Sequence, residues 1–414
     1  MAKQDVRPAR DRPPGVQVDA MTSGGPPPPR PAPVNSWSCP TTIYAERGAR
    51  RHIAALLAGS PVLLVTDTAP WAASGAVSDL IEKVRPVETV ARETAEPDLD
   101  LVARVRAAVR RHPGVARLAV GGGSVLDAAR IAALMDSDPR VAAAIPAALA
   151  RDGGVFLWPV ARDAGSPVLC VPSTLGTAAE VSPVAMVRGG GRTLLCVSPA
   201  LRSRAAALDP DVTATLPLDT LVAGLVEPMS RAMVPAVAGV PLTLSDRLAS
   251  ALVETLVDLG ESAAATPPGA VPDAEWRLAA ALASAATHTT FLALGRSPFG
   301  HALWPVATEL MTATGLTKPA VLGLLLPAWL DGIAAGALGP SFGTADRVKT
   351  ILGEDPSAAA ARQRCWLAGL HPAEATMTVD VAAVTARVAK WQAWGFLPGA
   401  TPAEIGWLVG AAAG

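Results

Sequence analysis

The chain has 414 residues, with 35 Lys and Arg against 36 Asp and Glu, and this balance gives no reason to expect a nucleic acid or another polyanion as its partner. Half of the residues are apolar and only 17% are charged, so a chain of this length can bury more than one core, which excludes a single small module. The cysteines are widely separated, which excludes a disulfide framework and a cysteine zinc site and favours a reducing cytoplasm; they are Cys39, Cys170, Cys196 and Cys365.

Residues 1–35 contain the run GGPPPPRPAP and are expected to form a disordered, proline-rich tail. A docking peptide for a partner protein is the alternative. The basic residues at the start are not followed by an apolar run, so we expect no secretory signal. The most apolar stretch, Ala320 to Gly339, contains Pro327 and Asp331 and indicates a buried helix rather than a membrane span.

Residues 36–217 alternate short apolar runs with helical spacing, which predicts a doubly wound α/β domain with a parallel sheet. We expect buried strands at Pro61–Thr66, Ala116–Val120 and Pro167–Val171, and helices at Asp98–His112 and Val125–Met135. The segments VAMV and TLLCV flank a glycine-rich turn, Arg188 to Arg192. They predict an antiparallel hairpin attached to the sheet.

Residues 218–414 carry no strand signal and are expected to form an all-helical domain. Helical spacing covers Asp273–Leu294, Ala320–Ala335 and Val379–Trp394, and Asp273 is a candidate N-cap.

The first motif with chemical meaning is VGGGSVLDAARIAA, Val120 to Ala133. A strand ends at Val120, Gly121, Gly122 and Gly123 form a turn, and a helix begins near Ser124. Such a turn brings backbone N–H groups and the positive end of a helix dipole against a phosphate. The arrangement favours phosphate binding over a turn that serves only tight packing.

A second loop, VPSTLGTAAEVSP, also follows a predicted buried strand. It places the hydroxyl groups of Ser173, Thr174 and Thr177 around Gly176. The loop taken alone leaves open whether these hydroxyl groups bind a ligand or satisfy a structural turn.

Together the two loops resemble the iron-containing alcohol dehydrogenase family, which shares its fold with glycerol dehydrogenase and dehydroquinate synthase. GGGSVLDAAR is similar to the family's G-G-G-S-x-x-D-x-A-K, and PSTLGTAAEVS to its P-T-T-x-G-T-G-S-E-V-T. ALDPDVTATLP and FGHALWPV, further along the chain, resemble its D-P-x-L-x-x-x-L-P and G-x-x-H-A-L-A-H segments. The resemblance extends roughly from residue 37 to residue 335.

The resemblance implies a dinucleotide-binding α/β domain, a helical domain, and an active site between them. It implies that Gly121, Gly122, Gly123 and Ser124 hold a pyrophosphate, and that Ser173, Thr174 and Thr177 line the same cofactor site. It also implies that Asp127 lies near the nicotinamide or the substrate.

Asp67 follows the first predicted strand, where such enzymes often carry an acid near the adenosine ribose. A carboxylate there would repel a 2'-phosphate and favour NAD over NADP. A turn residue in TDTAP is an equal alternative for Asp67.

The family usually holds Fe²⁺ or Zn²⁺ with an acidic residue and two or three histidines, but this chain has only 5 histidines. The resemblance matches His301 to a metal histidine and Glu227 to the acid. It places Pro305, Lys318 and Ser230 where other ligands would be expected. Two ligands make a poor divalent site, so the metal is doubtful.

Lysine is scarce beside arginine in this chain, which draws attention to Lys318. One hypothesis is that its ammonium group replaces the metal and donates to the substrate oxygen, while His301 orients the substrate or shuttles a proton. The alternative is that Lys318 pairs with Glu227 in a decayed site. Both interpretations stay open.

The remaining landmarks are expected to be structural. His288 is expected to be a satisfied helix residue, and most tryptophans are expected to lie in the core. Trp304, next to His301 in the motif, is a candidate for an apolar substrate cleft.

The leading functional hypothesis is an NAD(P)-dependent oxidoreductase that acts on an alcohol or carbonyl group of a small molecule or peptide. The alternatives are a dehydroquinate-synthase-like cyclase and a non-catalytic nucleotide-binding partner subunit. A further resemblance, to the dehydrogenase component of daptide-type peptide biosynthesis, suggests natural-product tailoring with a pathway partner protein. We expect a cytoplasmic homo-oligomer that binds neither nucleic acid nor membrane.

Overall fold

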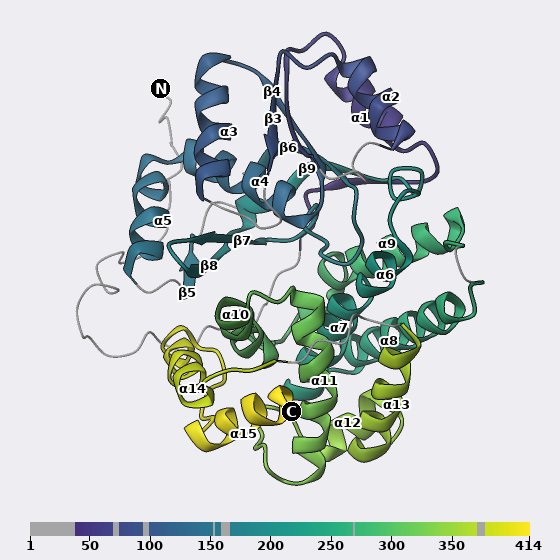
Figure 1. The fold of residues 1–414 in the computed structure, drawn as a ribbon, viewed down its shortest axis with the longest axis vertical. Coiled ribbons are helices and arrows are strands. Elements are labelled where there is room, and N and C mark those ends of the chain that lie inside the picture. Colours follow the sequence, from purple (N-terminus) through teal and green to yellow (C-terminus); the bar gives the residue numbers. More distant parts are fainter. Residues whose placement is uncertain are drawn as a thin grey trace, which may run out of the picture.

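A computed structural model describes residues 38–68, 74–93, 99–151, 154–158, 166–267, 270–370 and 377–414. The predicted proline-rich tail, 1–35, lies outside these ranges, as does His371. Within them, every strand precedes residue 209, and the regular elements after residue 217 are all helices (Figure 1). The predicted fold class, an α/β part followed by an all-helical part, is confirmed.

The α/β part is built on a six-stranded parallel sheet in the order β1-β9-β6-β4-β2-β3. The inner strands are runs of β-branched and aliphatic residues, as expected for strands covered on both faces. The bounds are β1 Thr42–Ala45, β2 Val62–Asp67, β3 Glu88–Arg92, β4 Ala116–Gly121, β6 Ser166–Pro172 and β9 Ser203–Leu208. The three strands predicted from sequence are β2, β4 and β6, each within about one residue of its expected ends.

Alternate residues of the strands serve two cores, because successive side chains point to opposite faces. On one face Leu63 and Val65 of β2 pack with α3 and α4; on the other Val62 and Leu64 pack with α1 and α2. Figure 1 shows these helix pairs on the two sides of the sheet. The helices are α1 Arg50–Leu57, α2 Gly75–Val84, α3 Leu99–Arg111, α4 Gly123–Ser137 and α5 Pro139–Arg151.

The predicted hairpin is present as β7 (Val184–Gly189) and β8 (Arg192–Val197), which pair antiparallel. It does not extend the main sheet as we expected. Instead β8 also pairs with β5 (Gly154–Leu157), so the hairpin belongs to a separate three-stranded sheet. This second sheet lies toward the helical half of the molecule (Figure 1).

The second half packs its helices around one large apolar core. Asp273 accepts a hydrogen bond from the backbone N–H of Trp276 and caps α9, as predicted. The helices are α6 Leu218–Ala223, α7 Val226–Ala238, α8 Thr243–Ala264, α9 Ala274–Thr289, α10 Leu303–Thr314, α11 Lys318–Ala334, α12 Ala345–Leu352, α13 Pro356–Gly369, α14 Val381–Lys390 and α15 Pro402–Ala413. Short 3₁₀ turns cover Pro199–Leu201, Phe291–Ala293 and Trp391–Trp394.

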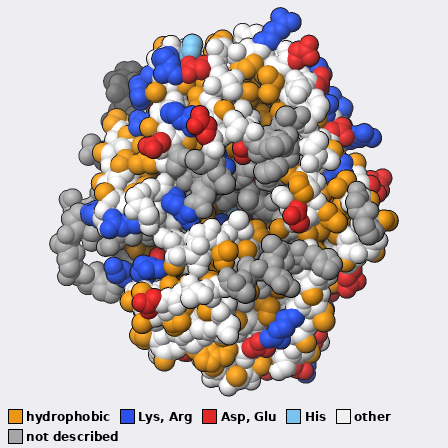
Figure 2. Space-filling model, viewed as in Figure 1, with side chains coloured by type: hydrophobic (Ala, Val, Ile, Leu, Met, Phe, Trp, Pro, Cys, Tyr) orange, Lys and Arg blue, Asp and Glu red, His pale blue; other side chains and the backbone are white. Residues whose placement is uncertain are grey.

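One stretch of the described chain, Leu218–Ala238, is long and apolar enough to cross a membrane, but 83% of its apolar 18-residue window is buried inside the protein. Its side chains form the centre of the helical core, and the predicted buried helix α11 packs beside it. Acidic and basic side chains are interspersed over the face shown in Figure 2, as expected from the near-neutral net charge.

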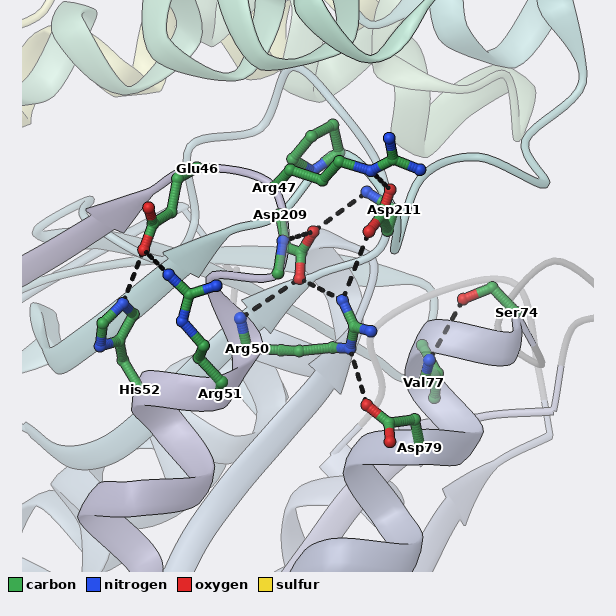
Figure 3. A network of polar contacts seen from close by, with 12 residues as sticks. Glu46, Arg47, Arg50, Arg51, His52, Ser74, Val77, Asp79, Asp209 and Asp211 are labelled. Atoms are coloured by element: carbon green, nitrogen blue, oxygen red, sulfur yellow. Dashed lines mark hydrogen bonds and ion pairs between the residues drawn. The ribbon is translucent and has the colours of Figure 1, made fainter.

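The segment that follows β9 is fixed by a buried carboxylate. The Asp209 side chain accepts hydrogen bonds from the backbone N–H of Gly48 (3.0 Å) and of Arg50 (3.2 Å), and pairs with the Arg50 guanidinium at 2.8 Å (Figure 3). Arg50 reaches on to Asp79 of α2. The D-P segment of the sequence motif therefore anchors the start of α1 to the end of the sheet.

Candidate active site

The glycine turn lies where β4 ends and α4 begins. Gly122 is the N-cap of α4, and Gly123 is the first residue of the helix. A Cβ atom on Gly123 would lie 2.7 Å from Cγ2 of Thr177, and one on Gly121 would lie 2.8 Å from Cβ of Val125. The turn is therefore glycine-rich because it packs its backbone directly against its neighbours, as a phosphate-binding turn requires.

The second loop folds onto this turn. The backbone N–H of Ser173 donates to the carbonyl of Gly121 at 2.9 Å. Gly176 has φ +100° and a Cβ there would collide with the carbonyl oxygen of Gly224 at the end of α6, so only glycine fits. The Ser173 hydroxyl is buried and has no hydrogen-bond partner within the described chain. A buried orphan hydroxyl beside the turn is what a binding site for a polar ligand would contain.

Asp67 stands at the end of β2, next to the strand that leads into the glycine turn. The pairing of Thr66 with Val120 places Asp67 beside Gly121, and Asp67 in turn pairs across to Arg92 of β3 with an N···O distance of 3.6 Å. The carboxyl ends of adjacent strands thus carry the turn, an acid and an arginine in one row. Asp67 does not line the cleft described next.

A cleft of about 270 Å³ lies between the two halves of the protein. Its walls come from the glycine turn and second loop, from the hairpin β7–β8, and from the helices α7, α9, α10 and α11. Of the residues predicted for the site, the structure brings six to this cleft: Gly123, Ser124, Asp127, Thr177, Glu227 and Lys318, the first residue of α11. Gly121, Gly122, Ser173 and Thr174 do not line it and belong to the two packed loops.

Asp127 lines the cleft, but both of its carboxylate oxygens are bonded to other groups of the protein. One carboxylate oxygen accepts the backbone N–H of Met186 at 2.8 Å, and the other pairs with Arg130, three residues along α4. Burial raises the pKa of Asp127, while Arg130 opposes the shift. Arg130 is fully buried and also donates to the carbonyl groups of Ser182 and Leu201. Asp127 therefore holds the hairpin against α4 beside the cleft.

A buried ionic triad forms at the helical wall of the cleft. Oε1 of Glu227 lies 2.8 Å from Nη1 of Arg231, one turn along α7, and 3.2 Å from Nζ of Lys318. The side chain of Arg231 is 4% exposed and that of Lys318 is 22% exposed. Two cations thus share one carboxylate, and the more exposed cation lines the cleft. Burial lowers the pKa of Arg231, and Glu227 opposes the shift.

His301 lies beside this triad without lining the cleft. Its Nε2 atom is 2.9 Å from Oγ of Ser230, and its ring stacks on Trp304 with a centroid distance of 5.1 Å. Burial, helped by the positive charge of Arg231 and Lys318, lowers the pKa of His301 to about 3. The imidazole is therefore neutral at any physiological pH. Trp304 itself lines the cleft.

These residues do not fit a divalent metal ion. Among the described residues, no group of three or more His, Cys, Asp and Glu side chains could hold one. Glu227 is shared by two cations, and Nε2 of His301 is engaged with Ser230. The positive charge that disfavours a proton on His301 also disfavours Fe²⁺ or Zn²⁺ beside it. In the region where the sequence resemblance places a metal ion, the cations present are the side chains of Arg231 and Lys318.

Two residues of this site were not predicted from the sequence. Arg231 follows Glu227 by four positions, the spacing at which helical side chains meet, so the pair was detectable in principle. His288 was expected to be a satisfied helix residue. Instead it lines the cleft from the last turn of α9, and its imidazole forms no hydrogen bond with any described residue.

The fold has two parts, and the glycine turn of the α/β part faces the polar side chains of the helical part across the cleft. The model of the iron-containing alcohol dehydrogenase family matches residues 40–210. A phosphonoacetaldehyde reductase from Streptomyces viridochromogenes is 30% identical over 325 residues, which are 74% of this chain and 77% of that protein. The chain belongs to the iron-containing alcohol dehydrogenase family and is an alcohol dehydrogenase-like oxidoreductase.

Solved structures agree on the fold. An NADH-dependent butanol dehydrogenase from Thermotoga maritima superposes with a TM-score of 0.75 at 19% identity, covering 93% of this chain and 100% of that one. A sulfoacetaldehyde reductase from Bifidobacterium kashiwanohense, in complex with NAD⁺, superposes with a TM-score of 0.65 at 17% identity, covering 86% and 92%. These structures show the fold, while the family model and the phosphonoacetaldehyde reductase favour the oxidoreductase over the cyclase.

Proposed function

We propose that this protein is an NAD(P)-dependent oxidoreductase that interconverts a carbonyl group and an alcohol without a metal ion, using the Lys318 ammonium group as its electrophile. The observation that carries the proposal is the Glu227–Arg231–Lys318 triad at the wall of the cleft. Arg231 alone balances the charge of Glu227. The positive charge of Lys318 is therefore surplus. Of the two cations in the triad, Lys318 lines the cleft and Arg231 does not.

The surplus charge favours a working lysine over a lysine that only pairs with Glu227. If Lys318 served only to neutralise the carboxylate, a second, partly buried cation on the same oxygen would be a cost without a gain, since a charge loses part of its hydration when it is partly buried. An ammonium group facing a small cleft can instead stabilise negative charge that develops on a bound oxygen.

The cofactor site is assigned to the two packed loops. Gly121, Gly122, Gly123 and Ser124 would present backbone N–H groups to a pyrophosphate, with Thr177 and the orphan Ser173 hydroxyl beside them. Thr174 packs against the turn. Asp67, on the neighbouring strand, favours NAD over NADP because its carboxylate would repel a 2'-phosphate. The NAD⁺ complex of the sulfoacetaldehyde reductase supports this assignment.

When bound, the nicotinamide supplies or accepts the hydride. The chain's own residues position the carbonyl group and manage its charge. Lys318 donates a hydrogen bond to the carbonyl oxygen, polarises the bond and stabilises the alkoxide. Glu227 holds Lys318 in place, and Arg231 in turn holds Glu227. The apolar side chains of Met186, Leu195 and Met311 line the same cleft and exclude water.

The substrate proposed is small. The cleft volume suits a short aldehyde or the end group of a larger molecule, including a peptide in natural-product tailoring. Arg188 of β7 also lines the cleft, so with Lys318 it can receive an anionic group. The phosphonate and sulfonate aldehydes named for two relatives are therefore the first substrates to test. The four cysteines are free, in keeping with the proposed cytoplasmic location. We also propose that the protein forms a homo-oligomer and acts with a partner protein of its pathway.

Calorimetric titration with NAD(H) and NADP(H) tests the cofactor assignment. We expect NADH to bind about tenfold or more tightly than NADPH, a difference of about 1.4 kcal/mol. Asp67→Ser should narrow that difference by improving NADPH binding, whereas Asp79→Ser, on the helix α2, should leave it unchanged. If none of the four nucleotides binds to folded protein, the oxidoreductase proposal fails.

A further inference from the structure

His288 lines the cleft, and the mechanism proposed above gives it no role. It sits in the last turn of α9, and it lines the same cavity as Lys318 and Asp127. It reaches that cavity from a different element than either of them. The side chain is thus placed to meet a substrate held between the hairpin and the helices.

The neighbouring polar groups of α9 are already engaged. The hydroxyl groups of Thr287, Thr289 and Thr290 donate to the carbonyl groups of Ser284, Ala285 and Ala286. Arg202 donates to the main-chain carbonyl of His288. The imidazole makes no hydrogen bond within the described chain, so both of its nitrogens are available to a ligand or to water in the cleft.

The charges that surround His288 keep its ring neutral. Burial lowers its pKa well below the usual range, and Arg231, Arg202, Arg130 and Lys318 lower it further. The acids near these cations are Asp127 and Glu227, which line the cleft, and Glu180, which does not. Asp127 and Glu227 are paired with these same cations, and burial raises the pKa of Glu180. A neutral imidazole offers one N–H donor and one acceptor nitrogen.

We propose that His288 is the proton relay of the reaction, a role that rests on the proposed oxidoreductase function. In the reducing direction the carbonyl carbon accepts the hydride, and the carbonyl π pair moves onto oxygen. That oxygen takes the N–H proton of His288, while the second ring nitrogen takes a proton from water in the same step. Lys318 stays protonated throughout and stabilises the charge on the oxygen. The net reaction consumes one hydride and one solvent proton.

The geometry gives this role to His288 rather than to His301, the residue for which the sequence suggested it. Nε2 of His301 is engaged with Ser230, and the ring is covered by Trp304. His301 does not line the cleft, whereas His288 does. His301 is therefore placed to support Ser230 and Trp304, and the relay passes through the other face of the cleft.

Steady-state aldehyde reduction by the full chain tests the relay with three variants: His288→Ala, His288→Gln and the control His112→Ala, a histidine at the end of α3 far from the cleft. We expect His288→Ala to lower kcat by about a hundredfold, with NADH binding unchanged. Added imidazole should restore part of that loss. His288→Gln keeps hydrogen-bonding groups but cannot relay a proton, so it should remain slow. His112→Ala should match the unaltered protein with and without imidazole.

Two results would overturn the relay while leaving the oxidoreductase intact. One is a kcat for His288→Ala within twofold of the unaltered enzyme. The other is full activity in His288→Gln with no rescue of His288→Ala by imidazole, which would make His288 a positioning residue. Failure of the unaltered protein to reduce any aldehyde while it binds NADH would contradict the proposed function, and the relay with it.

Discussion

Lys318→Met should lower kcat for aldehyde reduction by about a hundred- to a thousandfold, the loss seen when a single preorganised oxyanion donor is removed. Methionine keeps most of the length and apolar surface of the lysine stem but removes the charge. Arg231 remains to balance Glu227, so the buried carboxylate keeps a partner and the variant should fold. Thermal melting and NADH titration should therefore be nearly unchanged.

The matched control is Lys349→Met, on the helix α12 away from the cleft. It should show the kinetics of the unaltered enzyme. A Lys318→Met variant that retains a third or more of the original kcat would show that the ammonium group has no electrophilic role. The triad would then be a structural pair left in place of a metal site.

Gly123→Ala should weaken dinucleotide binding severely. The new Cβ atom would lie 2.7 Å from Cγ2 of Thr177, so the glycine turn and the second loop must move apart. Both loops supply the proposed phosphate contacts, and a shift of this kind displaces backbone N–H groups from a pyrophosphate. We expect a loss of at least about a hundredfold in NADH affinity, or about 2.7 kcal/mol, measured by calorimetry.

Gly75→Ala is the control for this variant, because Gly75 is also the first residue of a helix and a Cβ there meets nothing within 4 Å. It should bind NADH normally and melt at or slightly above the original temperature. If Gly123→Ala binds NADH as tightly as Gly75→Ala does, the glycine turn is a packing feature and the cofactor lies elsewhere.

In the proposed mechanism, the charge arrangement would let a member of an iron-containing family work without iron. A divalent ion and an ammonium group both stabilise an alkoxide, although the ammonium group does so less strongly. The ionic triad keeps that cation in a fixed position, and burial strengthens its interaction with a substrate oxygen. Burial and the positive charge of the same cations keep His288 and His301 neutral. A neutral ring suits His288 as a proton relay and His301 as a packed support for Ser230 and Trp304.

Much of the α/β half could be predicted from local pattern. The strand–turn–helix around Gly121 to Ser124 is encoded by a buried run, three glycines and helical spacing, all within about fifteen residues. The placement of the hairpin could not be predicted in this way. Its pairing partner β5 lies about forty residues before β8, and nothing in the VAMV or TLLCV segments distinguishes an added strand of the main sheet from a separate sheet.

The site residues also separate into those that a local motif reveals and those that depend on packing between distant elements. Glu227, His301 and Lys318 were identified because each stands at a motif position, and the ion pair between Glu227 and Lys318 was one of the two expected arrangements. The other cation, Arg231, and the exposure of His288 to the cleft depend on how α7 and α9 rotate against the hairpin. That rotation follows from packing across the two halves, so a residue pattern within one helix does not reveal it.

Metal analysis of the purified enzyme, combined with aldehyde reduction before and after treatment with a chelator, tests the metal-free mechanism most directly. We predict far less than one Fe or Zn per chain and NADH-dependent activity that survives chelation. One metal ion per chain, removed by the chelator together with the activity and restored with it, would contradict this mechanism.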